Sequence, residues 1–227
     1  MNPRTPDLWD SAAIAGYPTR SLTLPFGAEQ LSLLVVRRLE DYVDTDALLR
    51  DADAPEPPYW AHLWTGSRAL ARLVATEIDC AGRRVVEVGC GLGLVGIVAA
   101  RRGAAATLID TARAGLAFAR ANAALNGCVV NVLQTDIRRA GISGPFDLCL
   151  AAEVTYEPAL QIALADFLAV QLAPNGRAWC AESVRTTDQG FRRACESHGL
   201  HVTELEVREP DEPHDVSVRI TRVERPA

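Results

Sequence analysis

From Arg84 onward, short runs of apolar residues alternate with stretches whose apolar positions recur every three to four residues. The short runs indicate buried strands, and the longer spacing indicates helices with one buried face. The predicted strands are Arg84–Val88, Ala105–Asp110, Val129–Gln134, Phe146–Ala152, Gly176–Glu182, Leu200–Val207 and Val216–Val223. The predicted helices lie near residues 94–102, 112–125, 158–172 and 187–198. This alternation predicts an α/β fold with a mostly parallel sheet covered on both faces.

The last two predicted strands are joined only by Arg208–Pro213. Six residues cannot hold a crossover helix, so the seventh strand is predicted to run antiparallel to its neighbours. The expected fold class is a Rossmann-like sheet of seven strands, six parallel and the last antiparallel.

The first third of the chain has a different pattern. It predicts an extended arm at residues 1–20 and a hairpin formed by Ser21–Phe26 and Gln30–Arg38. It also predicts a short helix at Asp44–Arg50, an irregular proline-rich linker at Asp51–Pro58, and a helix with one buried face at Ser67–Ile78. We therefore divide the chain into an N-terminal extension, residues 1–56, and a main domain, residues 57–227.

Composition narrows the class of protein. A chain of 227 residues can bury one substantial α/β core. Its net charge of −6 argues against a nucleic-acid partner. No apolar run reaches 18 residues, so no membrane association is expected. The six cysteines and four histidines show no metal-ligand spacing, which predicts no metal and a reduced, cytoplasmic protein.

The glycine-rich turn Gly89-Cys90-Gly91-Leu92-Gly93 follows the apolar strand that ends at Val88. Glycines permit a sharp turn and let a cofactor approach where a Cβ would collide. Asp110 closes the next strand about 20 residues later, where the hydroxyls of a ribose need an acceptor. The turn therefore predicts a site for a nucleoside cofactor.

Two nucleoside cofactors compete for this site. Gly91 to Gly96 also satisfies the G-x-G-x-x-G spacing of a nicotinamide dinucleotide site. Glu87, two residues before the first glycine, favours S-adenosylmethionine, because a carboxylate attracts its cationic amino-acid end and repels a pyrophosphate. The turn also lies in mid-chain, and only one mononucleotide-type half follows it. S-adenosylmethionine is the predicted cofactor.

Further acids follow the later strands, where a parallel sheet binds its ligand. Asp136 follows the third strand and is a candidate acceptor for the adenine amino group. Glu153 and Tyr156 follow the fourth. Methyl transfer needs a neutral nucleophile, and holding a lysine amine of pKa about 10.4 neutral at pH 7 requires roughly 4.6 kcal/mol. A carboxylate that orients the amine and an aromatic wall that excludes water suit this task.

These motifs resemble a known family. Val85-Val86-Glu87-Val88-Gly89-Cys90-Gly91-Leu92-Gly93 resembles the first motif of the seven-strand S-adenosylmethionine-dependent methyltransferases. Glu153-Val154-Thr155-Tyr156 matches the (D/E)-x-x-(Y/F) motif of the protein methyltransferases that modify mainly lysine. The segment Pro58–Arg72 looks like the pre-motif segment of that family, most of all in the branch that modifies the β subunit of electron transfer flavoprotein. The resemblance runs from about residue 57 to the end.

The resemblance implies a role for each matching residue. Cofactor contacts are implied for Trp64 and Gly66, and contacts with the methionine part of the cofactor for Glu87, Gly89 and Gly91. Gly93 completes the glycine turn. Glu153 and Tyr156 are implied to face the target amine. Weaker candidates near the cleft are His62, Arg185 and His214.

The sequence therefore predicts a methyltransferase that acts on a side-chain nitrogen of a protein, with lysine favoured. The implied partner is a protein substrate, either the electron transfer flavoprotein β subunit or another cytosolic protein. Three alternatives remain open: a small-molecule N- or O-methyltransferase, a cofactor-binding partner protein without transfer activity, and a nicotinamide oxidoreductase.

Overall fold

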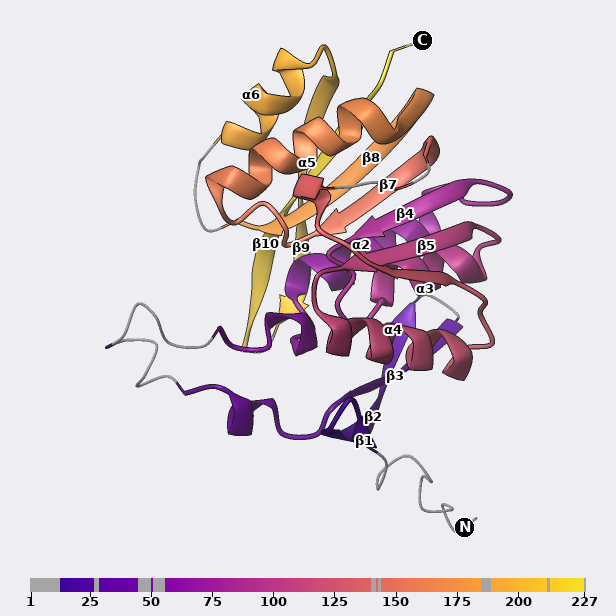
Figure 1. Ribbon diagram of the computed structural model, residues 1–227, viewed down its shortest axis with the longest axis vertical. Coiled ribbons are helices and arrows are strands. Elements are labelled where there is room, and N and C mark those ends of the chain that lie inside the picture. Colours follow the sequence, from indigo (N-terminus) through magenta and orange to yellow (C-terminus); the bar gives the residue numbers. More distant parts are fainter. Residues whose placement is uncertain are drawn as a thin grey trace.

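The computed structural model describes residues 13–26, 29–44, 50, 56–139, 142, 144–184, 189–211 and 213–226. A seven-stranded sheet has the strand order β6-β5-β4-β7-β8-β10-β9, and a three-stranded sheet has the order β1-β2-β3 (Figure 1). The large sheet contains β4 (Arg84–Val88), β5 (Ala105–Asp110), β6 (Asn131–Gln134), β7 (Phe146–Ala152), β8 (Leu172–Ser183), β9 (His201–Asp211) and β10 (His214–Glu224). The small sheet contains β1 (Ala13–Ile14), β2 (Tyr17–Phe26) and β3 (Glu29–Val36).

Five α-helices and three short 3₁₀ helices are found among the described residues. The α-helices are α2 (Thr65–Thr76), α3 (Leu94–Arg101), α4 (Arg113–Leu125), α5 (Pro158–Gln171) and α6 (Gly190–Ser197), and the 3₁₀ helices are η1 (Leu39–Tyr42), η2 (Tyr59–Ala61) and η3 (Ile137–Arg139). Helices α2, α3 and α4 lie over one face of the large sheet, and α5 and α6 cover the other (Figure 1). No helix in these ranges is both long and apolar enough to cross a membrane.

The strand directions confirm the predicted fold class. Strand β4 pairs in parallel with β5 and β7, while β10 runs antiparallel to both β8 and β9. The last four residues of β4 are buried on both sides of the sheet, which explains why its sequence is mostly apolar rather than alternating, with Glu87 as the one charged residue among the four. Parallel strands carry their carboxyl ends to one edge, where the predicted site residues then meet.

Several predicted boundaries were wrong. Strand β6 begins at Asn131 because the side chain of Val129 is 94% exposed and pairs with nothing in the sheet. Asp211 pairs with His214, so the described part of the predicted six-residue connection is largely strand. The start of β2 at Tyr17 places part of the predicted arm in the small sheet. Of the predicted helix at Asp44–Arg50, residues 45–49 lie outside the described ranges, as do residues 51–55 of the linker.

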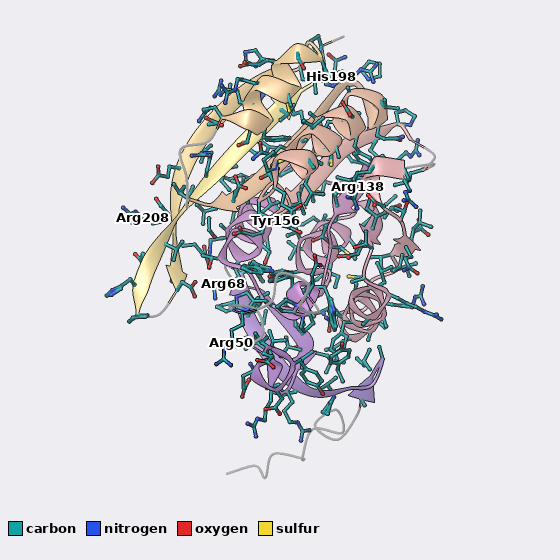
Figure 2. All side chains as sticks on the ribbon, turned by 60° about the vertical axis from the view of Figure 1, so that its left-hand side comes forward. Arg50, Arg68, Arg138, Tyr156, His198 and Arg208 are labelled. Carbon is teal, nitrogen blue, oxygen red and sulfur yellow. The ribbon has the colours of Figure 1, made fainter. Side chains whose placement is uncertain are left out.

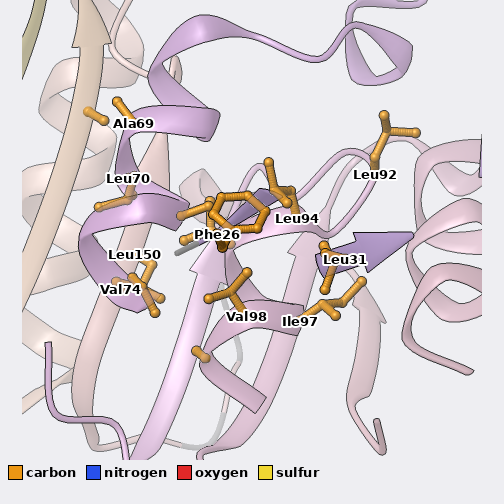
Figure 3. Close-up of a cluster of buried hydrophobic side chains, with 14 of the residues drawn as sticks. Phe26, Leu31, Ala69, Leu70, Val74, Leu92, Leu94, Ile97, Val98 and Leu150 are labelled. Atoms are coloured by element: carbon orange, nitrogen blue, oxygen red, sulfur yellow. The ribbon is translucent and has the colours of Figure 1, made fainter. Parts of the chain in front are cut away.

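The N-terminal hairpin contributes to the main hydrophobic core. Phe26 and Leu31 from the hairpin lie among side chains of α2 and α3, including Leu70, Leu94 and Ile97 (Figure 3). The extension is therefore packed as part of the same core rather than as a separate unit.

Asn122 on α4 forms hydrogen bonds with both this hairpin and the glycine-rich turn. Its side chain is fully buried, and its Oδ1 accepts a hydrogen bond from the Leu34 amide at 2.7 Å. Its Nδ2 donates to the carbonyls of Leu34 at 3.2 Å and Leu92 at 3.0 Å. One amide group thus satisfies main-chain atoms of both β3 and the glycine-rich turn.

We expect Asn122→Ala to lower the free energy of unfolding by about 2–3 kcal/mol, because it leaves several buried main-chain groups without hydrogen-bond partners. Chemical denaturation measures this loss. Asn131→Ala, at an exposed position at the start of β6, is the control and should change stability by less than about 0.5 kcal/mol. Equal effects of the two substitutions would show that the hairpin does not depend on this contact.

Candidate active site

The glycine-rich turn after β4 has the backbone that only glycine adopts easily. Gly89, Gly91 and Gly93 have φ values of 63°, 48° and 81°. A Cβ at Gly89 would collide with Cγ1 of Val154, and one at Gly91 would lie 2.7 Å from the carbonyl oxygen of Trp60. The turn is thus confined between two other segments, and it leaves main-chain atoms exposed to a ligand.

Glu87 lies beneath this turn. Its side chain is 4% exposed, and its Oε2 accepts a hydrogen bond from the Gly96 amide at 2.8 Å, in the first turn of α3. Burial raises the pKa of Glu87 to about 8, although the amides of Gly96 and Val95 act in the opposite direction. The carboxyl group is therefore held by a helix N-terminus and would be stabilised as an anion by a nearby cation.

The raised pKa of Glu87 fixes the sign of a pH effect. Between the ordinary value of 4.5 and about 8, the folded state binds more protons than the unfolded state, so stability falls as the pH rises through this range. A cationic ligand beside the carboxylate lowers the pKa, so its binding releases up to about one proton and tightens toward pH 8. Calorimetry of S-adenosylmethionine binding in buffers of different ionisation enthalpy measures this release.

Glu87→Gln should remove most of this pH dependence. The carboxyl groups around Glu87 include Asp110, whose pKa is also raised by burial and whose titration stays in the variant. An unchanged proton release in Glu87→Gln would show that Glu87 does not meet the cationic end of the cofactor.

Asp110 at the end of β5 fixes the glycine-rich turn from the other side. Its Oδ2 accepts a hydrogen bond from the Gly91 amide and its Oδ1 one from the Ala112 amide, both at 2.8 Å. Burial raises the pKa of this carboxyl group, and the amide donors oppose that rise. Each carboxylate oxygen keeps a further lone pair, so the arrangement is compatible with the predicted contact to ribose hydroxyls.

Asp136 has a different environment from the one expected. The Arg138 side chain bonds both of its oxygens, with Nε at 2.9 and 3.0 Å and Nη2 at 2.7 Å. This guanidinium, which sequence reasoning missed, holds the pKa of Asp136 below its ordinary range. Arg138 therefore shares the carboxylate of Asp136, which also lines the cavity, and the predicted contact with the adenine amino group stays a prediction.

The segment before α2 covers the turn with aromatic rings. The ring of Trp60 lies between those of Tyr17 and Phe118, each at a centroid distance of 5.2 Å, so it joins the hairpin to α4. Trp64 donates from Nε1 to the carbonyl of Tyr59 at 3.0 Å and packs edge-on to His62 at 4.5 Å. Trp60 is thus partly a structural residue, and Trp64 belongs to the wall of the site.

Glu153 and Tyr156 follow β7, the strand that pairs with β4. Glu153 has a φ of 57°, an uncommon conformation for a residue with a side chain, and its Oε1 accepts a hydrogen bond from the Gly66 amide at 3.0 Å. Tyr156 is 64% exposed. Burial of its hydroxyl and the nearby acid Glu157 raise its pKa, so the phenol stays protonated at neutral pH. Figure 2 shows Tyr156 near the middle of the molecule.

Gly66 and Gly93 do not line the site as predicted. A Cβ at Gly66 would lie 2.5 Å from Oε1 of Glu153, and one at Gly93 would lie 2.9 Å from Cβ of Ala119. Both glycines instead permit close packing behind the site: Gly66 brings the start of α2 against Glu153, and Gly93 brings the turn against α4.

A cavity of about 390 Å³ joins these groups, a volume typical of small-molecule sites. Its lining contains eight of the predicted site residues: Trp64, Glu87, Gly89, Gly91, Asp110, Asp136, Glu153 and Tyr156. His62 also lines it, whereas His214 lies at the exposed tip of the β9–β10 hairpin and does not. Arg185 is outside the described residues. Within the described ranges, no group of three or more metal-binding side chains is found.

The residues present fit S-adenosylmethionine. Gly89 and Gly91 of the turn line the cavity, together with the carboxyl groups of Glu87 and Asp110. Among the described residues, the lining carries six acidic side chains and one arginine: Glu56, Glu87, Asp110, Asp136, Glu153 and Glu157, with Arg138. Such a site favours a cationic ligand over a pyrophosphate, which argues against the nicotinamide alternative.

Comparison with known proteins supports the same assignment. Residues 59–152 match the family model of the methyltransferase small domain. EEF1A lysine methyltransferase 3 from Mus musculus is 31% identical over 171 residues, which are 71% of this chain and 71% of that protein. Electron transfer flavoprotein beta subunit lysine methyltransferase from Danio rerio is 33% identical over 113 residues, 49% of this chain. The chain spans only 44% of the Danio protein and 49% of its Xenopus laevis counterpart.

Solved structures share the fold at lower sequence identity. The 16S rRNA N2 G1207 methyltransferase of T. thermophilus aligns with a TM-score of 0.66 at 15% identity, covering 94% of this chain and 51% of that one. The ribosomal protein L11 methylase of Lactobacillus delbrueckii subsp. bulgaricus aligns at 0.58 and 22% identity, covering 71% of this chain and 79% of the other. Strand order, cofactor cradle and sequence similarity agree, and the chain therefore belongs to the seven-strand S-adenosylmethionine-dependent methyltransferases, in the family that includes EEF1A lysine methyltransferase 3.

Proposed function

We propose that this protein transfers a methyl group from S-adenosylmethionine to a side-chain nitrogen of another protein, with lysine as the favoured acceptor. The observation that carries the proposal is the shared cavity, which joins the glycine-rich turn and Asp110 on one side to Glu153 and Tyr156 on the other. A cofactor and an acceptor can therefore meet within one site. When bound, S-adenosylmethionine supplies an electrophilic methyl group that an amine lone pair can displace from sulfur.

In this proposal the glycine-rich turn and the side chains around it hold the cofactor. Glu87 and Asp110 hold the turn through its amides and offer negative charge to the cationic end and to the ribose hydroxyls of the cofactor. Trp64 forms part of the wall. Gly89 and Gly91 line the cavity next to these carboxyl groups.

The acceptor side uses Glu153 and Tyr156. A lysine amine arrives charged and must lose a proton before it can attack, and Glu153 orients the amine and helps this loss. Tyr156 presents an aromatic face that excludes water and favours the positive charge on the nitrogen. The acidic lining attracts the lysine ammonium into the cavity.

The exposure of Tyr156 supports a protein substrate. A ring that is 64% exposed at the mouth leaves the acceptor side open, as a side chain projecting from a large partner requires. Two relatives are named for lysine methylation of the electron transfer flavoprotein beta subunit and of EEF1A, and one for ribosomal protein L11. These proteins or their counterparts are the first candidates as substrates.

We also propose the division into an extension, residues 1–56, and a catalytic domain, residues 57–227, and a cytoplasmic location. The location is supported by the six cysteines, all of which are free thiols. In this division the extension helps to hold the segment around Trp60 over the glycine turn, through the contact of Tyr17 with Trp60.

Incubation with isotope-labelled S-adenosylmethionine and cell lysate tests the function. Mass spectrometry should find the label on lysine side chains of one or a few proteins, and purified candidates named above can then be assayed singly. Ubiquinone biosynthesis O-methyltransferases are also related, at 31% identity over 138 residues for the protein of Xanthomonas euvesicatoria. Label confined to small metabolites would therefore replace the proposal by a small-molecule methyltransferase.

A further inference from the structure

The carboxylate of Glu153 is fixed through one of its two oxygens. Oε1 accepts hydrogen bonds from the Gly66 amide at 3.0 Å, the Ser183 amide at 3.0 Å and the Ser183 hydroxyl at 2.5 Å. In the described part of the chain, the hydrogen bonds of this side chain all fall on Oε1. The other oxygen, Oε2, therefore remains for a group in the cavity that Glu153 lines.

Ser183 is the last residue of β8, and its side chain is 8% exposed. Strand β8 lies beside β7, whose end carries Glu153, and the Glu153 amide continues this pairing by donating to the Ala181 carbonyl at 2.8 Å. The neighbouring Glu182 accepts a hydrogen bond from the Thr155 hydroxyl at 2.5 Å. The end of β8 thus holds the loop between Glu153 and Tyr156 at two points.

These contacts explain how an unfavourable backbone conformation is kept. Glu153 has a positive φ, and such a conformation persists only where the surroundings determine it. Two donors belong to the main chain of α2 and β8 and are present with almost any side chain. The hydroxyl of Ser183 is the single side-chain donor among the three, so it is the one that a substitution can remove.

We propose that Ser183 is a positioning residue for methyl transfer: its hydroxyl holds Oε1 of Glu153 so that Oε2 faces the acceptor amine. This inference rests on the proposed function. Ser183 itself does not line the cavity, and it acts on the acceptor only through Glu153. The resulting orientation matters because a displacement of about 1 Å in a reacting group can lower a rate by about 100-fold.

Two substitutions in the full-length chain test this role. Ser183→Ala removes the hydroxyl, and Ser183→Thr keeps it on a side chain that suits a strand. With labelled S-adenosylmethionine and a fixed amount of lysate protein, we expect Ser183→Ala to lower the apparent kcat by about 10- to 100-fold and to change the KM for the cofactor by less than about twofold. Ser183→Thr should restore kcat to within about threefold of the unsubstituted protein.

A kcat of Ser183→Ala close to that of the unsubstituted protein would overturn the proposal. So would a loss of kcat in Ser183→Thr as large as in Ser183→Ala, because the effect would then not depend on the hydroxyl. A parallel loss of cofactor affinity and melting temperature in Ser183→Ala would also overturn it, since a merely structural serine would give that result.

A spectroscopic measurement separates this geometry from the proposed function. In ¹⁵N-labelled protein the amide resonance of Gly66 reports its bond to Glu153 and should move in both Ser183→Ala and Glu153→Ala. It should stay close to its original position in Ser183→Thr. An unmoved resonance in the two alanine variants overturns the positioning role, whereas absence of labelling by the unsubstituted protein, with the resonance moving as expected, refutes the function alone.

Discussion

Glu153→Ala is expected to lower methyl transfer to protein by about a thousandfold, while the affinity for S-adenosylmethionine changes by less than about tenfold. In the proposed function this carboxylate belongs to the acceptor side; it lies on the loop after β7 and bonds the start of α2 rather than the glycine-rich turn. Its removal should therefore affect the amine and leave the cofactor cradle intact. Transfer of isotope label measures the first effect and calorimetry with S-adenosylmethionine the second.

Asp166→Ala is the matched control for this change. It also removes a carboxylate, but one on α5 whose partner is His198, at 2.7 Å, and Figure 2 shows His198 near the top of the view, well above Tyr156. Its activity should match that of the unsubstituted protein. If Glu153→Ala lost cofactor affinity as severely as turnover, Glu153 would belong to the cofactor side. Tyr156→Ala should repeat the pattern of Glu153→Ala.

Gly91→Ala should weaken S-adenosylmethionine binding by more than about 100-fold, which corresponds to about 2.7 kcal/mol. Two causes act together. The φ of 48° is unfavourable for alanine, and the new Cβ would lie 2.7 Å from the carbonyl oxygen of Trp60. The turn and the segment that carries Trp60 must then move apart, and the Gly91 amide loses its hydrogen bond to Asp110.

Gly127→Ala separates the two causes. Gly127 also has a positive φ, 67°, but a Cβ there would meet no atom within 4 Å. This variant should lose about 1 kcal/mol of stability and bind the cofactor normally. Calorimetry and thermal unfolding of both variants make the comparison. Normal binding by a folded Gly91→Ala would show that the cofactor does not use this turn.

The sequence predicted the central strands well because they are buried on both faces. The observed bounds of β4, β5 and β7 equal the predicted ones, since each is a mostly apolar run that ends at, or just before, a polar residue or a glycine. Edge elements were predicted less well. Val129 looks like a strand residue but is exposed, and the segment before the β9–β10 turn looks like a loop, because of its prolines and acids, but pairs as strand. At edges, pairing partners rather than local pattern decide where a strand ends.

The site was predicted through one topological rule, that ligand-binding residues follow parallel strands at their carboxyl ends. This rule located Glu87, Asp110 and Glu153 in one cavity. It also applies to Ser183 at the end of β8, which no sequence motif singled out. Arg138 was missed because its partnership with Asp136 depends on the turn that η3 makes after β6.

By itself, the sequence determined the class of fold and the cofactor, because strand burial, glycine spacing and acids at strand ends are local properties; the acceptor roles of Glu153 and Tyr156 stay predictions. Only the tertiary structure decided how these residues are used. It placed Asp136 under Arg138, Gly66 against Glu153, and the hairpin on α4 through Asn122. Each of these contacts depends on how the chain folds in three dimensions. The spacing of residues along the sequence does not specify it.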